Sequence, residues 1–349
     1  ALEGLGRYSE AIKAWQQTYR FELAHFGMSN NETTLALSGW ASAEYRAGHW
    51  HAARDRFAQV LTRYARHGGK PQITQLSAAI KLCFLEGLMA HRVAAAQRCR
   101  AAKNMAAATF GNHSPGYGDA IESTGIGLLE VGDVDAAQAA LLHARKLYGN
   151  ARQNLQRVGR VDSFLALIDI LHGDNAQARD RLIPAIAGLR TRDFPLPPAL
   201  AQARLLLACD AAPSPVCPRK LGAQVATSLA TQAYASNPRA LEIRIALARL
   251  ALKHGQAAAA ESRLRDGIAK AQYELDAHHP QRLEAQLWLA LAEARQGQCV
   301  AAHIQADDTI HTLRANHLAA HPLLAAARSA LRHETRCGDL LPASPMPAD

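Results

Sequence analysis

Residues 238–264 read PRALEIRIALARLALKHGQAAAAESRL, and this stretch contains the pattern that decides the fold. Gly255 lies between two stretches whose apolar residues have helical spacing, each about four turns long. Ala248 precedes this glycine by seven residues, Ala260 follows it by five and Leu264 follows it by nine. The pattern predicts two antiparallel helices joined by a tight turn, with small residues where their axes come closest.

The same arrangement recurs along the chain at an interval of about 42 residues. In most units an alanine follows the turn by five residues, and a small residue precedes the turn by seven. One unit cannot bury its apolar face alone, so neighbouring units are expected to stack into a solenoid. The turns are marked by Gly6, Gly48, Gly132, Gly173, Gly255 and Gly297, with two more turns expected near residues 90 and 214.

Two segments between the units carry a motif of their own. Residues 110–115 read FGNHSP, and residues 277–280 read AHHP. With the repeat, they resemble the inter-repeat segments of kinesin-light-chain-like long repeats of the tetratricopeptide repeat (TPR) family. The resemblance implies an all-α fold, a right-handed α-solenoid of about eight two-helix TPR-like repeats over residues 1–341. Residues at about 322–336 lack a partner helix, which predicts a C-terminal capping helix, and the Pro-, Ala- and Ser-rich residues 342–349 predict a flexible tail.

The composition agrees with a helical protein and argues against several other classes. Hydrophobic residues make up 49% of the 349 residues and are mostly Ala and Leu, whereas aromatic residues make up only 5%. Strand formers are therefore sparse. The sequence contains no run of about 18 apolar residues, the length needed to cross a membrane. The net charge is +9, but it is spread along the chain without an aromatic or loop motif, so no nucleic-acid partner is expected. Arg far outnumbers Lys, which is typical of a GC-rich bacterial genome.

The six cysteines suggest disulfides. Six cysteines allow fifteen complete pairings, and the repeat geometry favours one of them. It joins neighbours within one or two helices: Cys83 with Cys99, Cys209 with Cys217, and Cys299 with Cys337. Three disulfides would place the protein in an oxidising compartment. The alternative is six ordinary small residues in a reduced cytosolic protein, which Cys83 fits well because its position requires a small side chain.

No motif for catalysis or cofactor binding is present. His303, Asp307 and His311 share one helix face at a spacing that would suit a metal, but a solvated face is the favoured interpretation. His278, His279, His317 and His321 lie between helices, where a structural role is preferred. We therefore predict no catalytic residues, no cofactor and no metal, and we do not expect this segment to be an enzyme.

The resemblance also indicates where a partner would bind. In this family the first helix of each repeat lines the concave surface, at positions counted back from the turn. Carried over, these positions predict the partner-binding residues Tyr45, Arg46, Asp119, Glu122, Arg160, Glu242, Arg249 and Lys253. Because these residues are mixed in charge, a protein or peptide ligand is favoured over a polyanion.

Two functions follow as expectations. The first is a non-catalytic protein- or peptide-binding domain, the periplasmic sensor segment of a bacterial receptor-type Ser/Thr kinase. It would be tethered to the inner membrane through an upstream segment and would relay ligand binding to the cytoplasm. The alternative is a cytoplasmic TPR adaptor, or the peptide-sensing domain of a transcription regulator. Neither expectation identifies the ligand or the oligomeric state.

Overall fold

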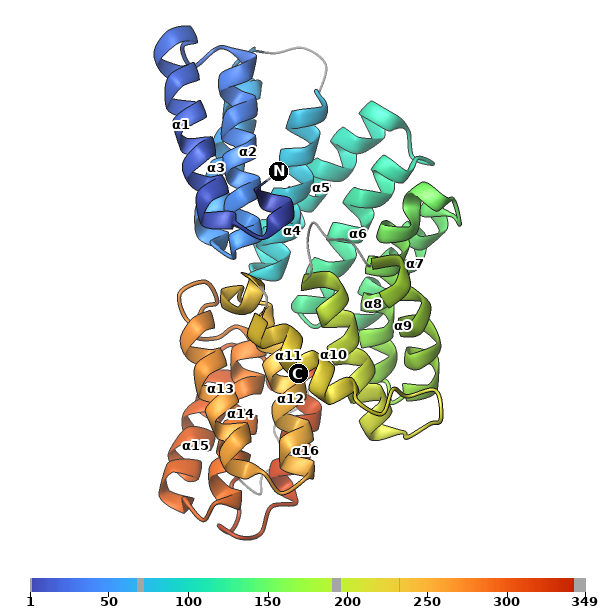
Figure 1. The fold of residues 1–349 in the computed structure, drawn as a ribbon, viewed down its shortest axis with the longest axis vertical. Helices are drawn as coiled ribbons and strands as arrows, with labels where there is room; N and C mark the ends of the chain where they lie inside the picture. Colours follow the sequence, from blue (N-terminus) through green and yellow to red (C-terminus); the bar gives the residue numbers. More distant parts are fainter. Residues whose placement is uncertain (1, 68–71, 190–195, 232, 342–349) are drawn as a thin grey trace.

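The chain is a helical solenoid (Figure 1). The computed structural model describes residues 2–67, 72–189, 196–231 and 233–341, and all the regular structure in these ranges is helical. Within the described ranges, sixteen α-helices pack mainly against their neighbours in sequence. The all-α solenoid predicted from the repeat is therefore confirmed.

Seven antiparallel hairpins form most of the solenoid. They pair α2 (Asn31–Ala47) with α3 (Trp50–His67), α4 (Ile73–Leu88) with α5 (Arg92–Phe110), α6 (Pro115–Glu130) with α7 (Val134–Tyr148), α8 (Leu155–Leu171) with α9 (Asn175–Leu189), α10 (Leu196–Ala211) with α11 (Leu221–Thr231), α12 (Ala240–Lys253) with α13 (Ala257–Ala271), and α14 (Pro280–Arg295) with α15 (Cys299–Ala315). The first of the eight expected units differs, since it consists of η1 (Glu3–Leu5) and α1 (Tyr8–Phe26), which packs against α2.

The turns explain the glycine marks. All six marked glycines have positive φ, from 71° to 94°, the left-handed conformation that ends a helix most easily with glycine. At the mark without glycine, Ala90 adopts the same conformation with φ 57°. The mark expected near 214 is a longer connection, residues 212–220, which contains three prolines and is closed by the Cys209–Cys217 disulfide.

The expected capping helix is shorter than predicted. The segment folds as η4 (Pro322–Leu324) followed by α16 (Ala325–Arg332), so the helix ends four residues before 336. Cys337 is bonded to Cys299, and the backbone N–H of Arg336 binds the Glu334 side chain. These contacts draw the chain off the helix axis towards the start of α15. The predicted tail, 342–349, lies outside the described residues.

The repeat positions pack as their size suggests. Ala248, Ala260 and Leu264 are each 0% exposed. At the equivalent place in another unit, a Cβ added to Gly125 would lie 2.9 Å from Cγ of Leu141, the larger residue nine positions after the turn. The large side chain thus fills the space that the small residue leaves, which gives the hairpin its close packing.

All three expected disulfides are present. Cys83–Cys99 joins the two helices of one hairpin, Cys209–Cys217 closes the connection between α10 and α11, and Cys299–Cys337 ties the chain beyond α16 to the start of α15. Such bridges form and persist in oxidising surroundings.

Two histidines join distant units to one another. Nε2–H of His279 donates to the carbonyl oxygen of Leu88 at 2.8 Å, and Nε2–H of His321 donates to that of Glu130 at 3.1 Å. Both pairs are 191 residues apart, which is about four and a half repeats. The solenoid therefore completes one superhelical turn over this distance, and the N-terminal hairpins rest on the C-terminal ones (Figure 1).

We call this contact between the N-terminal and C-terminal hairpins the seam, and it explains one small residue at a turn. A Cβ on Gly48 would lie 2.9 Å from Cδ of Pro238. The segment that contains Pro238 therefore joins those of His279 and His321 as the third that contacts a turn across the seam. Pro238, Pro280 and Pro322 are spaced by 42 residues, as are the turns that they face. The structural role expected for His279 and His321 is thus a contact between superhelical turns.

Candidate ligand-binding site

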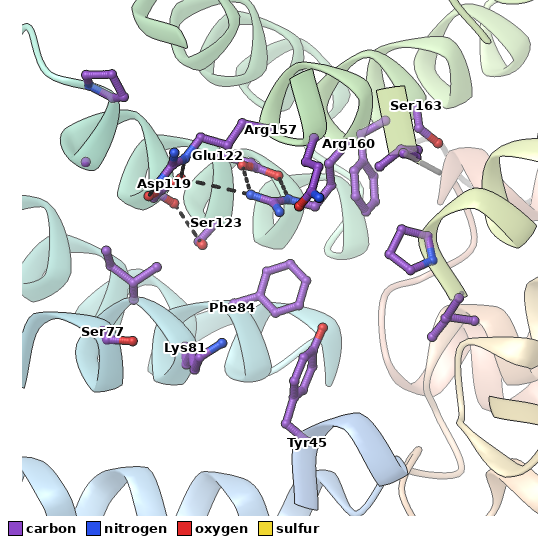
Figure 2. A pocket seen from close by; sticks show the side chains of 18 of the residues that line it. Tyr45, Ser77, Lys81, Phe84, Asp119, Glu122, Ser123, Arg157, Arg160 and Ser163 are labelled. Atoms are coloured by element: carbon purple, nitrogen blue, oxygen red, sulfur yellow. Dashed lines mark hydrogen bonds and ion pairs between the residues drawn. The ribbon is translucent and has the colours of Figure 1, made fainter. Parts of the chain in front are cut away.

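A cavity of about 920 Å³ lies on the inner surface of the superhelix. Its walls come from the first helices of five consecutive hairpins, α2, α4, α6, α8 and α10, and Figure 2 shows the side chains that converge on it. We call it the concave cavity. Its volume is at the upper end of the range for small-ligand sites.

One wall of the concave cavity is an ion-pair network between α6 and α8 (Figure 2). Arg157 binds Asp119 through two hydrogen bonds of 2.8 and 2.9 Å, and Arg160 binds Glu122 through its Nε and, at 2.7 Å, its Nη2. The hydroxyl of Tyr148 donates to Glu122 at 2.7 Å from behind. Glu122 is thus held from two sides and Asp119 by two hydrogen bonds from one arginine, which presents a preorganised charged surface to a ligand.

A second, more buried network closes the other end. Arg204, only 1% exposed, binds Glu242 at 2.6 and 3.0 Å and donates to the backbone oxygen of Ser163 at 2.8 Å. Arg239 shares the same carboxylate at 3.3 Å, and both guanidinium groups lie within 5 Å of the Phe164 ring centroid. Burial alone would raise the pKa of Glu242, but the charges and hydrogen bonds of the two arginines outweigh it and hold that pKa below its usual value.

Lys81 stands apart from both networks. Its Nζ lies 5.5 Å from the ring centroid of Tyr45, which packs edge-on against Phe84. Within the described residues, no hydrogen bond or ion pair engages this ammonium group. Burial, together with the positive charges of Arg46 and Arg160, lowers the pKa of Lys81 to about 8.

Five of the eight predicted partner-binding residues meet at this cavity. Tyr45, Arg46, Asp119, Glu122 and Arg160 all line it, although they come from three different repeats. Positions counted back from each turn therefore identify one surface in the folded chain.

The other three predicted residues lie elsewhere. Glu242 does not line the cavity, because Arg204 and Arg239 stand in front of it. The Arg249 guanidinium lies 5.1 Å from the Trp288 ring centroid, and Lys253 is paired with Asp210 at 2.8 Å. All three belong to α12, which follows the last helix that contributes to the cavity wall.

Several lining residues were missed from the sequence, although a signal for them exists. Asp119–Arg157, Glu122–Arg160 and Arg204–Glu242 are each 38 residues apart. This is one repeat less about one helical turn, so an acid and an arginine at this spacing meet across adjacent first helices. A search for that spacing would have identified Arg157 and Arg204. Lys81 also stands 38 residues from an acid, Asp119, but in the folded chain Arg157 engages that carboxylate.

The described part of the chain contains no group of three or more His, Cys, Asp or Glu side chains placed to hold a metal ion. His303, one of the residues considered for such a site, instead contacts the backbone oxygen of Cys337 at 2.9 Å. None of the helices within the described ranges has the length and apolar character needed to cross a bilayer.

Comparison with known proteins identifies no family for this chain, so its architecture alone defines its class. The chain matches no protein-family model, and no curated protein matches it. Its tandem packing of helices is that of a helical repeat protein. The tetratricopeptide resemblance therefore rests on the repeat and on the inter-repeat segments at 110–115 and 277–280.

Proposed function

We propose that this domain is a non-catalytic binding module of TPR type whose concave cavity takes a peptide or a segment of another protein. The observation that carries the proposal is the convergence of five first helices on one cavity of about 920 Å³. Repeat solenoids use such concave surfaces for binding. The concave cavity is lined by apolar, neutral polar and charged side chains. Such a lining is expected for a site that binds both the side chains and the backbone groups of a peptide.

Binding is tested by selection from a peptide library with the oxidised protein, followed by calorimetry on the retained peptides. Substitution of Arg160 by Ala removes one side of the ion-pair network and should weaken binding by at least tenfold, since it leaves Glu122 short of its partner. The matched control is Arg152→Ala in η2 (Arg152–Asn154), which is exposed and does not line the cavity. Equal loss in both variants would contradict binding in the cavity.

We further propose that the domain works outside the cytoplasm. The three disulfides support this location, because reduced cytosol does not maintain such bonds. A thiol titration of the protein isolated without reductant, unfolded in denaturant, should find no reactive thiol, and six after reduction. Free thiols before reduction would favour the alternative, a cytoplasmic adaptor or the peptide-sensing domain of a transcription regulator.

The wider role that we propose is that of a sensor joined to a receptor-type Ser/Thr kinase, which would relay ligand binding across the inner membrane. The resemblance of the repeats to those of TPR proteins supports this role. In a full-length protein, addition of a selected peptide should change the phosphorylation of the kinase domain, and the Arg160→Ala variant should not respond. Phosphorylation that is indifferent to every bound peptide would contradict the role.

A further inference from the structure

Lys81 is the cation of the concave cavity that the described part of the chain leaves without a carboxylate. The five arginines that line the cavity are all paired: Arg46 with Glu3, Arg157 with Asp119, Arg160 with Glu122, and both Arg204 and Arg239 with Glu242. Six cations thus share four carboxylates, which leaves an excess of two positive charges at the site. One of these charges belongs to Arg204 and Arg239, which share Glu242, and the other is the ammonium group of Lys81.

The surroundings of Lys81 favour an incoming anion. The charged and titratable groups that face it are Glu3 on η1, Tyr45 and Arg46 on α2, Asp119 and Glu122 on α6, and Arg157 and Arg160 on α8. The four carboxylates of the site are engaged by arginines, so they attract Lys81 less than free ones would. A further negative charge placed beside Lys81 would meet an ammonium group in partly desolvated surroundings, where electrostatic attraction is stronger than in water.

The remaining lining identifies the kind of molecule that carries this anion. Ser77, Ser123, Ser163, Gln153 and Gln156 provide neutral hydrogen-bonding groups along the cavity. A hydrocarbon chain would leave these groups unpaired at a cost in free energy, whereas peptide groups would pair with them. Apolar side chains between them, such as Phe84, suit the side chains of a peptide.

We propose that the concave cavity binds a peptide through a carboxylate group that docks against Lys81. The inference rests on the proposed binding function of the same cavity and specifies the ligand group that it recognises. The carboxylate can belong to the C-terminus of the peptide or to an Asp or Glu side chain, and both present the same chemistry to the ammonium group.

Binding of this kind is linked to a proton. Burial and the charges of Arg46 and Arg160 lower the pKa of Lys81 to about 8 in the empty cavity, and a carboxylate beside it would raise that pKa. Binding near pH 8 therefore takes up a fraction of a proton, about half, and affinity falls as the pH rises from about 7 to 9. Below pH 7 Lys81 is already charged, so the affinity levels off until the ligand carboxylate becomes protonated.

Three pools of N-acetylated tetrapeptides test the proposal on the oxidised protein. The first has free C-termini and no Asp or Glu, the second is the same pool as C-terminal amides, and the third consists of amides that contain Asp or Glu. We expect retention from the first or third pool, with the tightest acid binding at least tenfold better than its uncharged counterpart. Which of these two pools is retained identifies the source of the carboxylate.

The other outcomes separate the two proposals. If the uncharged amides bind as tightly as the acids, recognition of a carboxylate is wrong while the binding function stands. If no pool is retained at all, the binding function itself fails, and the inference about Lys81 fails with it.

Variants of Lys81 then test the residue. Lys81→Met should lower the affinity for the selected acid about tenfold, to that of its amide. Lys81→Arg should keep the preference for the acid but remove the decline between pH 7 and 9, since Arg stays charged there. Lys146→Met, an exposed change on α7 away from the cavity, serves as the matched control and should alter neither property. A decline with pH that persists in Lys81→Arg would overturn the assignment of the proton to Lys81.

Discussion

Single glycines determine how closely the first helices approach one another. A Cβ added to Gly87 on α4 would lie 2.6 Å from Cα of Gly127 on α6, so the two helix backbones touch there. We expect Gly87→Ala to lower the free energy of unfolding by about 1–3 kcal/mol, because the backbone of α6 must move. Helix propensity alone would favour the alanine by about 1 kcal/mol, so the two explanations predict opposite signs.

Urea denaturation of the variant measures this difference. Gly222→Ala is the matched control, because a Cβ on Gly222 would meet only the ends of the Leu250 and Leu206 side chains, and the nearer of these, Leu250, can move aside. A stability of Gly87→Ala equal to or above that of the unchanged protein would show that α4 and α6 are not in contact.

Ala90 provides a prediction of the opposite kind. It occupies the turn between α4 and α5 with φ 57°, a conformation that disfavours any residue with a Cβ. Ala90→Gly should therefore raise the free energy of unfolding by about 0.5–1 kcal/mol, after allowing for the greater flexibility of glycine in the unfolded chain. A shift of the urea midpoint to higher concentration would confirm it, and a lower midpoint would contradict the left-handed turn.

At the level of helices, the disulfides differ in what they restrain. The Cys299–Cys337 bond spans 38 residues and anchors the chain after α16, whereas Cys209–Cys217 spans only 8 and closes a local connection. In the chain-entropy account, loss of the longer loop costs about 4 kcal/mol and loss of the shorter one about 2.5 kcal/mol. Paired Cys→Ala variants of each bond should thus differ in urea stability by about 1.5 kcal/mol.

The location of the effect is a second readout of these variants. Hydrogen exchange should increase in α16 when Cys299 and Cys337 are replaced. This helix packs against the last hairpin on one side only, so it opens more easily once the disulfide after it is lost. Replacement of Cys209 and Cys217 should leave α16 protected. If both pairs loosen the same helices, the two bonds do not act locally.

Across the whole molecule, the seam between superhelical turns depends on two neutral histidines. In His279 and His321 the ring Nδ1 accepts a backbone N–H, from Gln281 and Leu323 respectively, while Nε2 donates across the seam. Burial lowers the pKa of both imidazoles to about 4, against an ordinary value of 6.5. The unfolded chain therefore binds more protons than the folded chain between pH 6.5 and 4, and the stability that these residues contribute is lost as the pH falls through that window.

The double variant His279→Gln/His321→Gln isolates this effect, since Gln keeps a donor but does not titrate. The variant should be less stable than the unchanged protein at pH 7, and the gap should narrow as the pH falls from about 6.5 to 4.5. Thermal unfolding at a series of pH values measures the gap, and taking the difference removes other groups that titrate in this range. A gap that stays constant with pH would mean that these two rings are not held neutral by the fold.

Much of this architecture is readable from the repeat because each signal is local. Gly255 with Ala248, Ala260 and Leu264 predicts a hairpin, since helix period, small contact residues and a left-handed turn all lie within about 25 residues. The Cys83–Cys99 disulfide follows from the same register, because cysteines on antiparallel helices at similar heights lie close together. Five lining residues of the cavity were found likewise by counting back from the turns, as Tyr45 and Arg160 illustrate.

The contacts across the seam and the charge balance of the cavity could not be predicted from such local sequence patterns. The angle between successive hairpins is small and accumulates over about four and a half units, so slight differences in packing decide whether His279 reaches Leu88. Arg249 lies away from the cavity for the same reason, because the curvature that puts α2 and α10 around one cavity carries α12 past it. The periodicity of the chain establishes which helix faces pack against one another. The three-dimensional path of the superhelix decides that Lys81 lacks a carboxylate. Pairing across the cavity depends on distances between repeats, and no local sequence pattern encodes those distances.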